Sequence, residues 1–230
     1  MRILIINPNT TASMTQKIGI AAGKVAASGT EIIARNPIIG PASIQGPADG
    51  EAALPGLFSE IEEAEKEPFD AIIIACFDDT GLYQARQRTR RPVIGIGEAA
   101  FHAATLVGSR FSVVTTLSVS VPVIQDNIAT YGFGGRCARV RASEVPVLEL
   151  ERPGSDACHT ISAEIATALS DDDVDAIVLG CAGMADLAHQ LSVEHGVPVI
   201  DGVAAAVKLA EMLHALGLET SQAGPFRKSA

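Results

Sequence analysis

The chain has 230 residues, of which 47% are hydrophobic and 19% charged, enough for a large core in one domain or in two lobes. Its formal net charge is −10 and its pI about 4.9, which argues against nucleic acid and anionic membrane surfaces as partners. No apolar run approaches the ~18 residues that a membrane span needs, and a strand-like segment begins at Arg2. We therefore expect a cytoplasmic protein without a membrane span.

Strand-like and helix-like segments alternate along the chain. Continuous apolar runs predict strands at residues 2–7, 69–76, 92–97, 110–115, 174–181 and 198–203. Helices are predicted at residues 11–27, 57–67, 98–106, 155–169 and 203–216. The Pro- and Gly-rich stretch 36–50 predicts a long loop that could cover a cleft.

Two of the four cysteines occupy matching places in two copies of one motif. Phe69-Asp-Ala-Ile-Ile-Ile-Ala-Cys76 is followed 105 residues later by Val174-Asp-Ala-Ile-Val-Leu-Gly-Cys181. The strand-like segments beginning at Arg2 and Pro92 have counterparts 108 and 106 residues further on. Three matches in the same order and at nearly the same offset indicate that the chain arose by duplication of a half-length sequence.

Strands of continuous Val, Ile and Leu that alternate with helices predict a parallel sheet covered on both faces. With the duplication, they predict an α/β fold of two pseudo-symmetric, doubly wound parallel-sheet lobes of Rossmann or flavodoxin-like type. The active site is expected in the cleft between the lobes, at the carboxyl ends of the strands. We assign residues 1–97 and 204–230 to the first lobe and residues 98–203 to the second.

Each of the two matching cysteines ends an apolar strand and precedes a short loop. A helix N-terminus after such a loop would lower the thiol pKa and could hold an oxyanion. A single cysteine here would more often be a small buried apolar residue. Two at equivalent positions predict that Cys76 and Cys181 face one cleft, where one thiol removes a proton and the other returns it. Cys137 and Cys158 lack this context, and no zinc-ligand spacing occurs.

Polar residues at the other strand ends have two interpretations each. Asn9 either caps the first helix or binds a substrate carbonyl or carboxylate. Thr115 and Thr116 occupy the corresponding place in the second half and have the same two interpretations. Asp78 and Asp79 either cap a helix or orient a substrate that carries N–H groups.

With these residues in view, the chain resembles the aspartate/glutamate/hydantoin racemase superfamily, most closely its hydantoin racemase branch. The resemblance covers nearly the whole length. The segments that carry it are Ile-Asn-Pro-Asn-Thr-Thr (6–11), Gly-Pro-Ala-Ser-Ile (40–44), Ala-Cys-Phe-Asp-Asp (75–79), Gly-Ile-Gly-Glu-Ala-Ala (95–100), Phe-Ser-Val-Val-Thr-Thr-Leu (111–117), Val-Leu-Gly-Cys-Ala-Gly-Met (178–184) and Pro-Val-Ile-Asp-Gly-Val (198–203).

The resemblance implies an isomerase that racemises 5-substituted hydantoins with two cysteines and without pyridoxal phosphate or another cofactor. It also implies self-association. The substrate contacts that it implies are Asn9, Ser43, Phe77, Asp78, Asp79, Thr115, Thr116, Ala182, Gly183 and Met184. Hydantoin racemases usually carry Gly-Asp-Pro-Gly after the first cysteine and Ser-Ile-Glu-Gly-x-Tyr-Asp in the early loop. Residues 78–81 and 43–49 depart from these patterns, which leaves the C5 substituent open and makes allantoin a candidate substrate.

Two other functions are compatible with the same pattern. A sister activity, of the aspartate/glutamate racemase or arylmalonate decarboxylase type, is the nearer one. An amino-acid substrate calls for a cationic anchor, which the loops named above lack, and a decarboxylase needs only one cysteine. A two-lobed protein that only binds a small molecule would share the architecture but needs no paired thiols.

Overall fold

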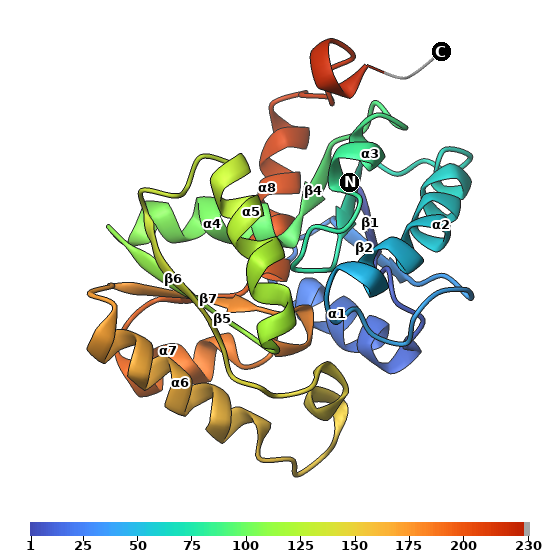
Figure 1. Ribbon diagram of the computed structural model, residues 1–230. Helices are drawn as coiled ribbons and strands as arrows, with labels where there is room; N and C mark the ends of the chain where they lie inside the picture. Colours follow the sequence, from blue (N-terminus) through green and yellow to red (C-terminus); the bar gives the residue numbers. More distant parts are fainter. Residues whose placement is uncertain (228–230) are drawn as a thin grey trace.

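The computed structural model describes residues 1–227 and consists of two four-stranded parallel sheets flanked by helices (Figure 1). Residues 228–230, which end the predicted first lobe, lie outside the described residues. The strands are β1 (Arg2–Ile6), β2 (Glu31–Arg35), β3 (Ala71–Ile74), β4 (Val93–Gly95), β5 (Phe111–Thr115), β6 (Cys137–Ala142), β7 (Ala176–Gly180) and β8 (Val199–Ile200). The α-helices are α1 (Ala12–Val25), α2 (Pro47–Ala64), α3 (Leu82–Arg86), α4 (Ile96–Val107), α5 (Val121–Thr130), α6 (Ala157–Asp171), α7 (Ala188–His195) and α8 (Gly202–Ala215).

The two sheets have the same strand order. The first is β2-β1-β3-β4 and the second β6-β5-β7-β8, with every neighbouring pair parallel. Flavodoxin-like folds begin with this strand order. In each sheet the order in which successive strands are added reverses between the two central strands. The predicted α/β class with two similar lobes is therefore confirmed.

The central strands consist of residues that are almost all buried. Residues 3–6 of β1 and all residues of β3, β5 and β7 are shielded from solvent, because helices cover both faces of each sheet. The edge strands β2 and β6 are mostly half-exposed and carry charged residues, so their apolar pattern is weak. For this reason the sequence analysis did not predict them.

The long loop predicted at residues 36–50 is shorter in the structure. Helix α2 begins at Pro47, ten residues before the predicted start, and continues through Pro55 to Ala64. Proline is well tolerated in the first turn of a helix, where an N–H has no intrahelical partner, so the proline-rich stretch is partly helical. Helices α5 and α7 and the short helix α3 were not predicted.

Helices α4 and α8 connect the two halves of the chain. Helix α4 contacts β7 of the second sheet, α8 contacts β3 of the first, and the two helices pack against each other. At their starts the backbones almost touch, since a Cβ on Gly202 would lie 2.4 Å from the carbonyl oxygen of Ile96. The assignment of residues 1–97 and 204–230 to one lobe and 98–203 to the other stays a prediction.

Across residues 1–227, none of the helices combines the length and the apolar character that crossing a membrane requires.

Candidate active site

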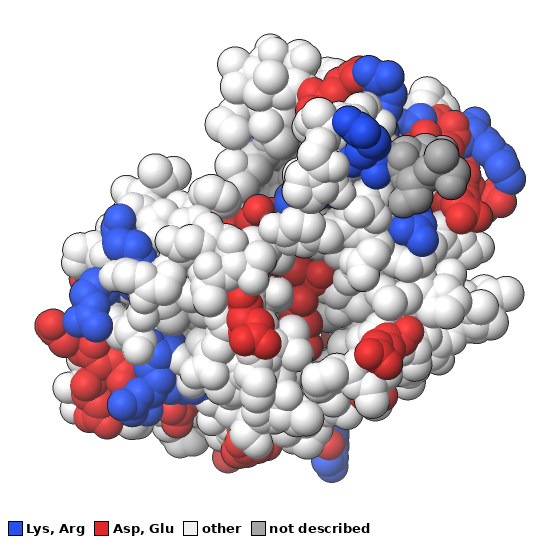
Figure 2. Space-filling view, turned by 45° about the horizontal axis from the view of Figure 1, so that its top comes forward, with Lys and Arg blue, Asp and Glu red and all other residues white. Residues whose placement is uncertain are grey.

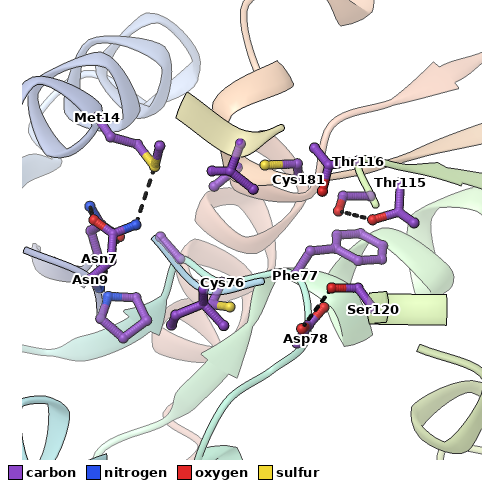
Figure 3. Close-up of a pocket in the computed structure, with 16 residues that line it drawn as sticks. Asn7, Asn9, Met14, Cys76, Phe77, Asp78, Thr115, Thr116, Ser120 and Cys181 are labelled. Atoms are coloured by element: carbon purple, nitrogen blue, oxygen red, sulfur yellow. Dashed lines mark hydrogen bonds between the residues drawn. The ribbon is translucent and has the colours of Figure 1, made fainter. Parts of the chain in front are cut away.

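A pocket lies where the carboxyl ends of the central strands of both sheets meet. Its walls are formed by residues that follow β1, β3, β5 and β7, together with residues from α1 and from three loops (Figure 3). The lining residues are Asn7, Pro8, Asn9, Met14, Ile44, Ala75, Cys76, Phe77, Asp78, Thr115, Thr116, Ser120, Val147, Gly180, Cys181 and Ala182. This is the place where open α/β sheets bind ligands.

Cys76 and Cys181 line this pocket from different sheets, Cys76 after β3 and Cys181 after β7 (Figure 3). In both loops the backbone N–H two residues beyond the cysteine donates to the sulfur, Asp78 to Cys76 and Gly183 to Cys181. Cys76 also accepts a hydrogen bond from Thr80 Oγ1 at 3.4 Å. The two thiols therefore share an amide contact at equivalent positions of the repeat and differ in the hydroxyl contact.

The pKa of both thiols is raised in the ligand-free protein, which corrects the expectation from sequence. Burial raises the pKa of Cys181 to about 11 and that of Cys76 further, and the amide hydrogen bonds only partly oppose this. No α-helix begins directly at either thiol, because α3 starts at Leu82 and the residues after Cys181 form one 3₁₀ turn, Ala182–Met184. A helix dipole falls off within about a turn, so it contributes little here.

Asp78 is a carboxyl group in the wall of the pocket. Its Oδ2 accepts a hydrogen bond from Ser120 Oγ at 3.3 Å, and its backbone carbonyl accepts one from Asn127 Nδ2 at 2.8 Å. Burial raises the pKa of Asp78 to about 6. At neutral pH its negative charge raises the pKa of both Cys76 and Cys181.

Asp79 has a different position and does not line the pocket. Its carboxylate accepts hydrogen bonds from the backbone N–H of Gly97 at 3.0 Å and Glu98 at 2.8 Å, and from the Tyr131 hydroxyl at 3.0 Å. It thus caps the N-terminus of α4, which is the capping interpretation of this residue. A Cβ on Gly95 would lie 2.1 Å from Asp79 Oδ1, so the glycine-rich turn before α4 leaves room for this carboxylate.

Asn9 lines the pocket with a side-chain amide whose oxygen is well bonded and whose NH₂ group has one weak partner. Its Oδ1 accepts from Asn7 Nδ2 and from the backbone N–H of Thr11, both at 2.9 Å. Within residues 1–227 its Nδ2 has only the sulfur of Met14 as a partner, at 3.3 Å, and a thioether is a weak acceptor. Asn9 therefore both orders the start of α1 and keeps donor capacity toward the pocket.

The two threonines at the end of β5, Thr115 and Thr116, also have different roles. Thr115 Oγ1 donates to the carbonyl of Gly180 at 2.9 Å, which ties β5 to β7 beside Cys181. Thr116 is buried in the pocket wall, and its hydroxyl makes no hydrogen bond with any residue in 1–227. Only Thr116 is thus free to contact a ligand with its hydroxyl.

Of the remaining predicted substrate contacts, some line the pocket and others do not. Phe77 and Ala182 line the pocket, whereas Ser43, Gly183 and Met184 are not among its lining residues. The sequence analysis missed eight lining residues, which are Asn7, Pro8, Met14, Ile44, Ala75, Ser120, Val147 and Gly180. Several of these adjoin predicted residues in the chain, but no local signal marks Ser120 or Val147, which reach the pocket only through the fold.

The pocket has an acidic character. None of its lining residues is Lys, Arg or His, and no group of three His, Cys, Asp or Glu side chains within residues 1–227 is arranged to hold a metal ion. Figure 2 shows acidic side chains in the hollow near the middle of one face, while most of the Lys and Arg side chains in view lie away from it.

Comparison with known proteins agrees with this architecture. Residues 3–210 match the family model described as Asp/Glu/Hydantoin racemase. A hydantoin racemase of Rhizobium meliloti is 47% identical over 98% of this chain and 94% of that protein. The solved structure of an allantoin racemase from Klebsiella pneumoniae is 47% identical, with a TM-score of 0.97, and covers 100% of this chain and 94% of its own. That of an allantoin racemase from Pseudomonas fluorescens is 41% identical, with a TM-score of 0.96, and covers 100% and 97%. The chain therefore belongs to the Asp/Glu/hydantoin racemase family.

Proposed function

We propose that this protein racemises 5-substituted hydantoins, allantoin included, by a proton transfer at C5 in which Cys76 and Cys181 are the two bases. The observation that carries the proposal is that both cysteines line one pocket from equivalent strand ends of the two sheets. The names of the relatives, hydantoin racemase and allantoin racemase, support the substrate class.

In the proposed reaction one cysteine is a thiolate and the other a thiol. The thiolate removes the C5 proton from one face of the ring, and the electron pair of the C5–H bond moves toward the adjacent carbonyl, which becomes an enolate. The thiol on the opposite side then gives its proton to C5. A carbon about 3–3.5 Å from each sulfur requires the two sulfurs to be roughly 7 Å apart, and proton exchange with water restores the starting state.

The enolate oxygen needs hydrogen-bond donors, since such donors contribute about 10²–10³ in rate each. Asn9 Nδ2 and the Thr116 hydroxyl are free for this purpose. The amides of Asp78 and Gly183 favour the thiolate form of each cysteine and partly offset the rise in pKa that burial causes. No cofactor takes part in this mechanism.

The charge of the pocket favours a hydantoin over the substrates of the sister activities. Aspartate, glutamate and arylmalonates carry carboxylates, which call for a cationic partner. The lining residues include Asp78 but no Lys, Arg or His. A hydantoin ring is neutral and presents both carbonyl acceptors and N–H donors, which suits this wall.

The test is C5 proton–deuterium exchange, followed by NMR with each enantiomer of allantoin and of a 5-alkylhydantoin. We expect wild-type protein to exchange and racemise both enantiomers above the rate in buffer. Cys76→Ser and Cys181→Ser should each lose about 10²–10⁴ in racemisation rate. Each variant should still exchange one enantiomer, and the two variants should retain opposite ones. Cys158→Ser serves as the matched control, because this cysteine lies outside the pocket and should not affect the rate.

Two results would contradict the proposal. If folded wild-type protein exchanged neither compound, the substrate class would be wrong. If one cysteine variant retained racemisation of both enantiomers, the two-base mechanism would be wrong even with the substrate class intact.

The proposal includes a cytoplasmic location and a self-associating protein whose partner is a small molecule. All four cysteines are free thiols, as a reducing compartment would keep them. Size-exclusion chromatography with light scattering measures the oligomeric state.

A further inference from the structure

Among the residues that the structure describes, one carboxylate oxygen of Asp78 has no partner. Its Oδ2 is held by Ser120, but within residues 1–227 no donor reaches Oδ1. This oxygen is not sealed in the interior, because Asp78 lines the pocket and its Oδ1 is not among the fully buried atoms that lack partners. A carboxylate oxygen in a pocket without cations is an acceptor for N–H groups of a ligand.

The side chain is also fixed in place by the other half of the molecule. Asp78 follows β3 of the first sheet, whereas Ser120 and Asn127 follow β5 of the second and hold its side chain and its carbonyl. Because the carboxylate is oriented before any ligand binds, a hydrogen bond to it costs little side-chain conformational entropy.

The position of Asp78 along the pocket indicates which part of a ligand it meets. In Figure 3, Asn9 and Met14 lie at one end and Asp78 and Ser120 at the other, with the two cysteines between them. The free donor of Asn9 thus lies at one end and the free acceptor of Asp78 at the other. With C5 between the sulfurs and the enolate oxygen toward Asn9, the C5 substituent extends toward Asp78.

A second pocket continues from this end. We call it the outer pocket; it shares Asp78 with the first and is otherwise lined by residues that include Gly46, Gly50, Glu51 and Gln84. The apolar residues Pro47, Leu54 and Val123 line it as well, so polar and apolar groups both face this pocket. A substituent that passes Asp78 therefore enters a mixed space, in which Glu51 and Gln84 offer acceptors.

We infer that Asp78 is a specificity-determining residue whose free carboxylate oxygen accepts hydrogen bonds from N–H donors on the C5 substituent. This inference rests on the proposed function. The preferred substrates of the protein are then neutral hydantoins whose C5 substituent carries N–H donors, such as the ureido group of allantoin. Asp78 does not select for the ring, which all 5-substituted hydantoins share.

The test compares two substrates of nearly equal size, allantoin and 5-isobutylhydantoin. The ureido and isobutyl groups each have four heavy atoms, but only the ureido group has N–H donors. The readout is the ratio of kcat/KM for C5 exchange with allantoin to that with 5-isobutylhydantoin. Any effect of Asp78 on the thiols, whose pKa it raises, acts on both substrates and cancels in this ratio.

We expect wild-type protein to prefer allantoin and Asp78→Ala to lower the ratio by about 10- to 100-fold, the range for a hydrogen bond to a charged group. Asp78→Asn keeps a neutral acceptor of the same shape, so the ratio should fall less, by about 2- to 10-fold. Asp126→Asn is the control, because Asp126 is an exposed carboxylate on α5 that lines neither pocket. It should leave the ratio unchanged.

The outcomes separate this inference from the proposed function. Exchange of both substrates by wild type, with a ratio that neither Asp78 variant changes, overturns the inference alone. An equal loss with both substrates also overturns it, since Asp78 would then bind the ring. If wild type exchanges neither substrate, the proposed function fails and the inference fails with it. The wild-type ratio requires no variant, and a value near one counts against the inference even if Asp78→Ala does not fold.

Discussion

Asp78 and Asp79 are adjacent in the chain but have separate partners. Asp78 lines both the pocket that holds the two thiols and the outer pocket. Asp79 lines only the outer pocket, and its carboxylate accepts hydrogen bonds from the amides of Gly97 and Glu98. The backbone makes this possible, since Asp79 has a positive φ of 48°, a conformation that Asp adopts more readily than most residues. Of two carboxyls that a sequence motif presents together, one thus lines the pocket of the two cysteines and the other caps a helix.

The two thiols differ in their readiness to ionise. Burial raises the pKa of Cys181 to about 11 and that of Cys76 further. The charge of Asp78 is the second cause at Cys76, whereas at Cys181 the charge of Lys17 opposes it. Since the thiolate is the form that reacts with alkylating agents, we expect iodoacetamide to modify Cys181 before Cys76 in the free protein. Below the pKa of each thiol the rate should rise about tenfold per pH unit.

Mass spectrometry of peptides after timed alkylation at several pH values measures both rates. Asp78→Asn should bring the two rates closer by accelerating Cys76. Faster modification of Cys76 than of Cys181 in the wild type would contradict the expectation that Cys76 has the higher pKa.

At the scale of elements, the start of α4 depends on a residue from a distant loop. Asp79 supplies acceptors for two backbone amides of α4, and Tyr131, which follows α5, donates to the same carboxylate. By contrast, α8 is capped by the residue just before it, since Asp201 accepts from the amides of Val203 and Ala204, both at 2.9 Å. The cap of α4 therefore also connects the Cys76 loop with the second half of the chain.

Asp79→Ala should lower the free energy of unfolding by about 2–4 kcal/mol, because it removes a helix cap and leaves buried donors without a partner. Asp79→Asn retains one acceptor oxygen and should lose less. Urea denaturation measures both values. Neither variant should change the ratio of rates with allantoin and 5-isobutylhydantoin, and a selective loss with allantoin would instead make Asp79 a substrate contact.

At the scale of the whole molecule, folding buries several aspartates in an acidic protein. The net charge is −10, and burial raises the pKa of Asp78 to about 6, of Asp79 to about 7 and of Asp201 to about 6. An aspartate in an unfolded chain has a pKa of about 3.9. Between these values the folded protein binds more protons than the unfolded chain, so lowering the pH stabilises the fold.

We therefore expect the free energy of unfolding to be higher at pH 5.5 than at pH 8, by about 1–3 kcal/mol. This stabilisation is fully present below pH 4 and is lost as the pH rises through 6 and 7. Carboxylates with a lowered pKa, such as Asp175 at about 2, act oppositely, but only below about pH 4. Chemical denaturation across this range is the measurement, and Asp79→Asn should flatten the dependence. A free energy that decreases from pH 8 to pH 5.5 would contradict this account.

The sequence by itself determined the duplicated α/β architecture and the two cysteines, because both depend on local pattern. A buried parallel strand is a continuous apolar run, and its carboxyl end is visible as the residue where the run stops. Edge strands such as β6 lack that pattern because one side of them faces solvent, and they became apparent only in the fold.

Only the tertiary structure decided the electrostatics and the division of roles. The expectation of a lowered thiol pKa failed because burial depends on all the segments that cover a side chain, which spacing does not reveal. Likewise, the side chains that hold Asp78 and Asp79 come from the other half of the chain, at Ser120, Asn127 and Tyr131. Contacts between residues distant in sequence are set by how the two sheets pack, so the local motif could name these carboxyls but could not assign their roles.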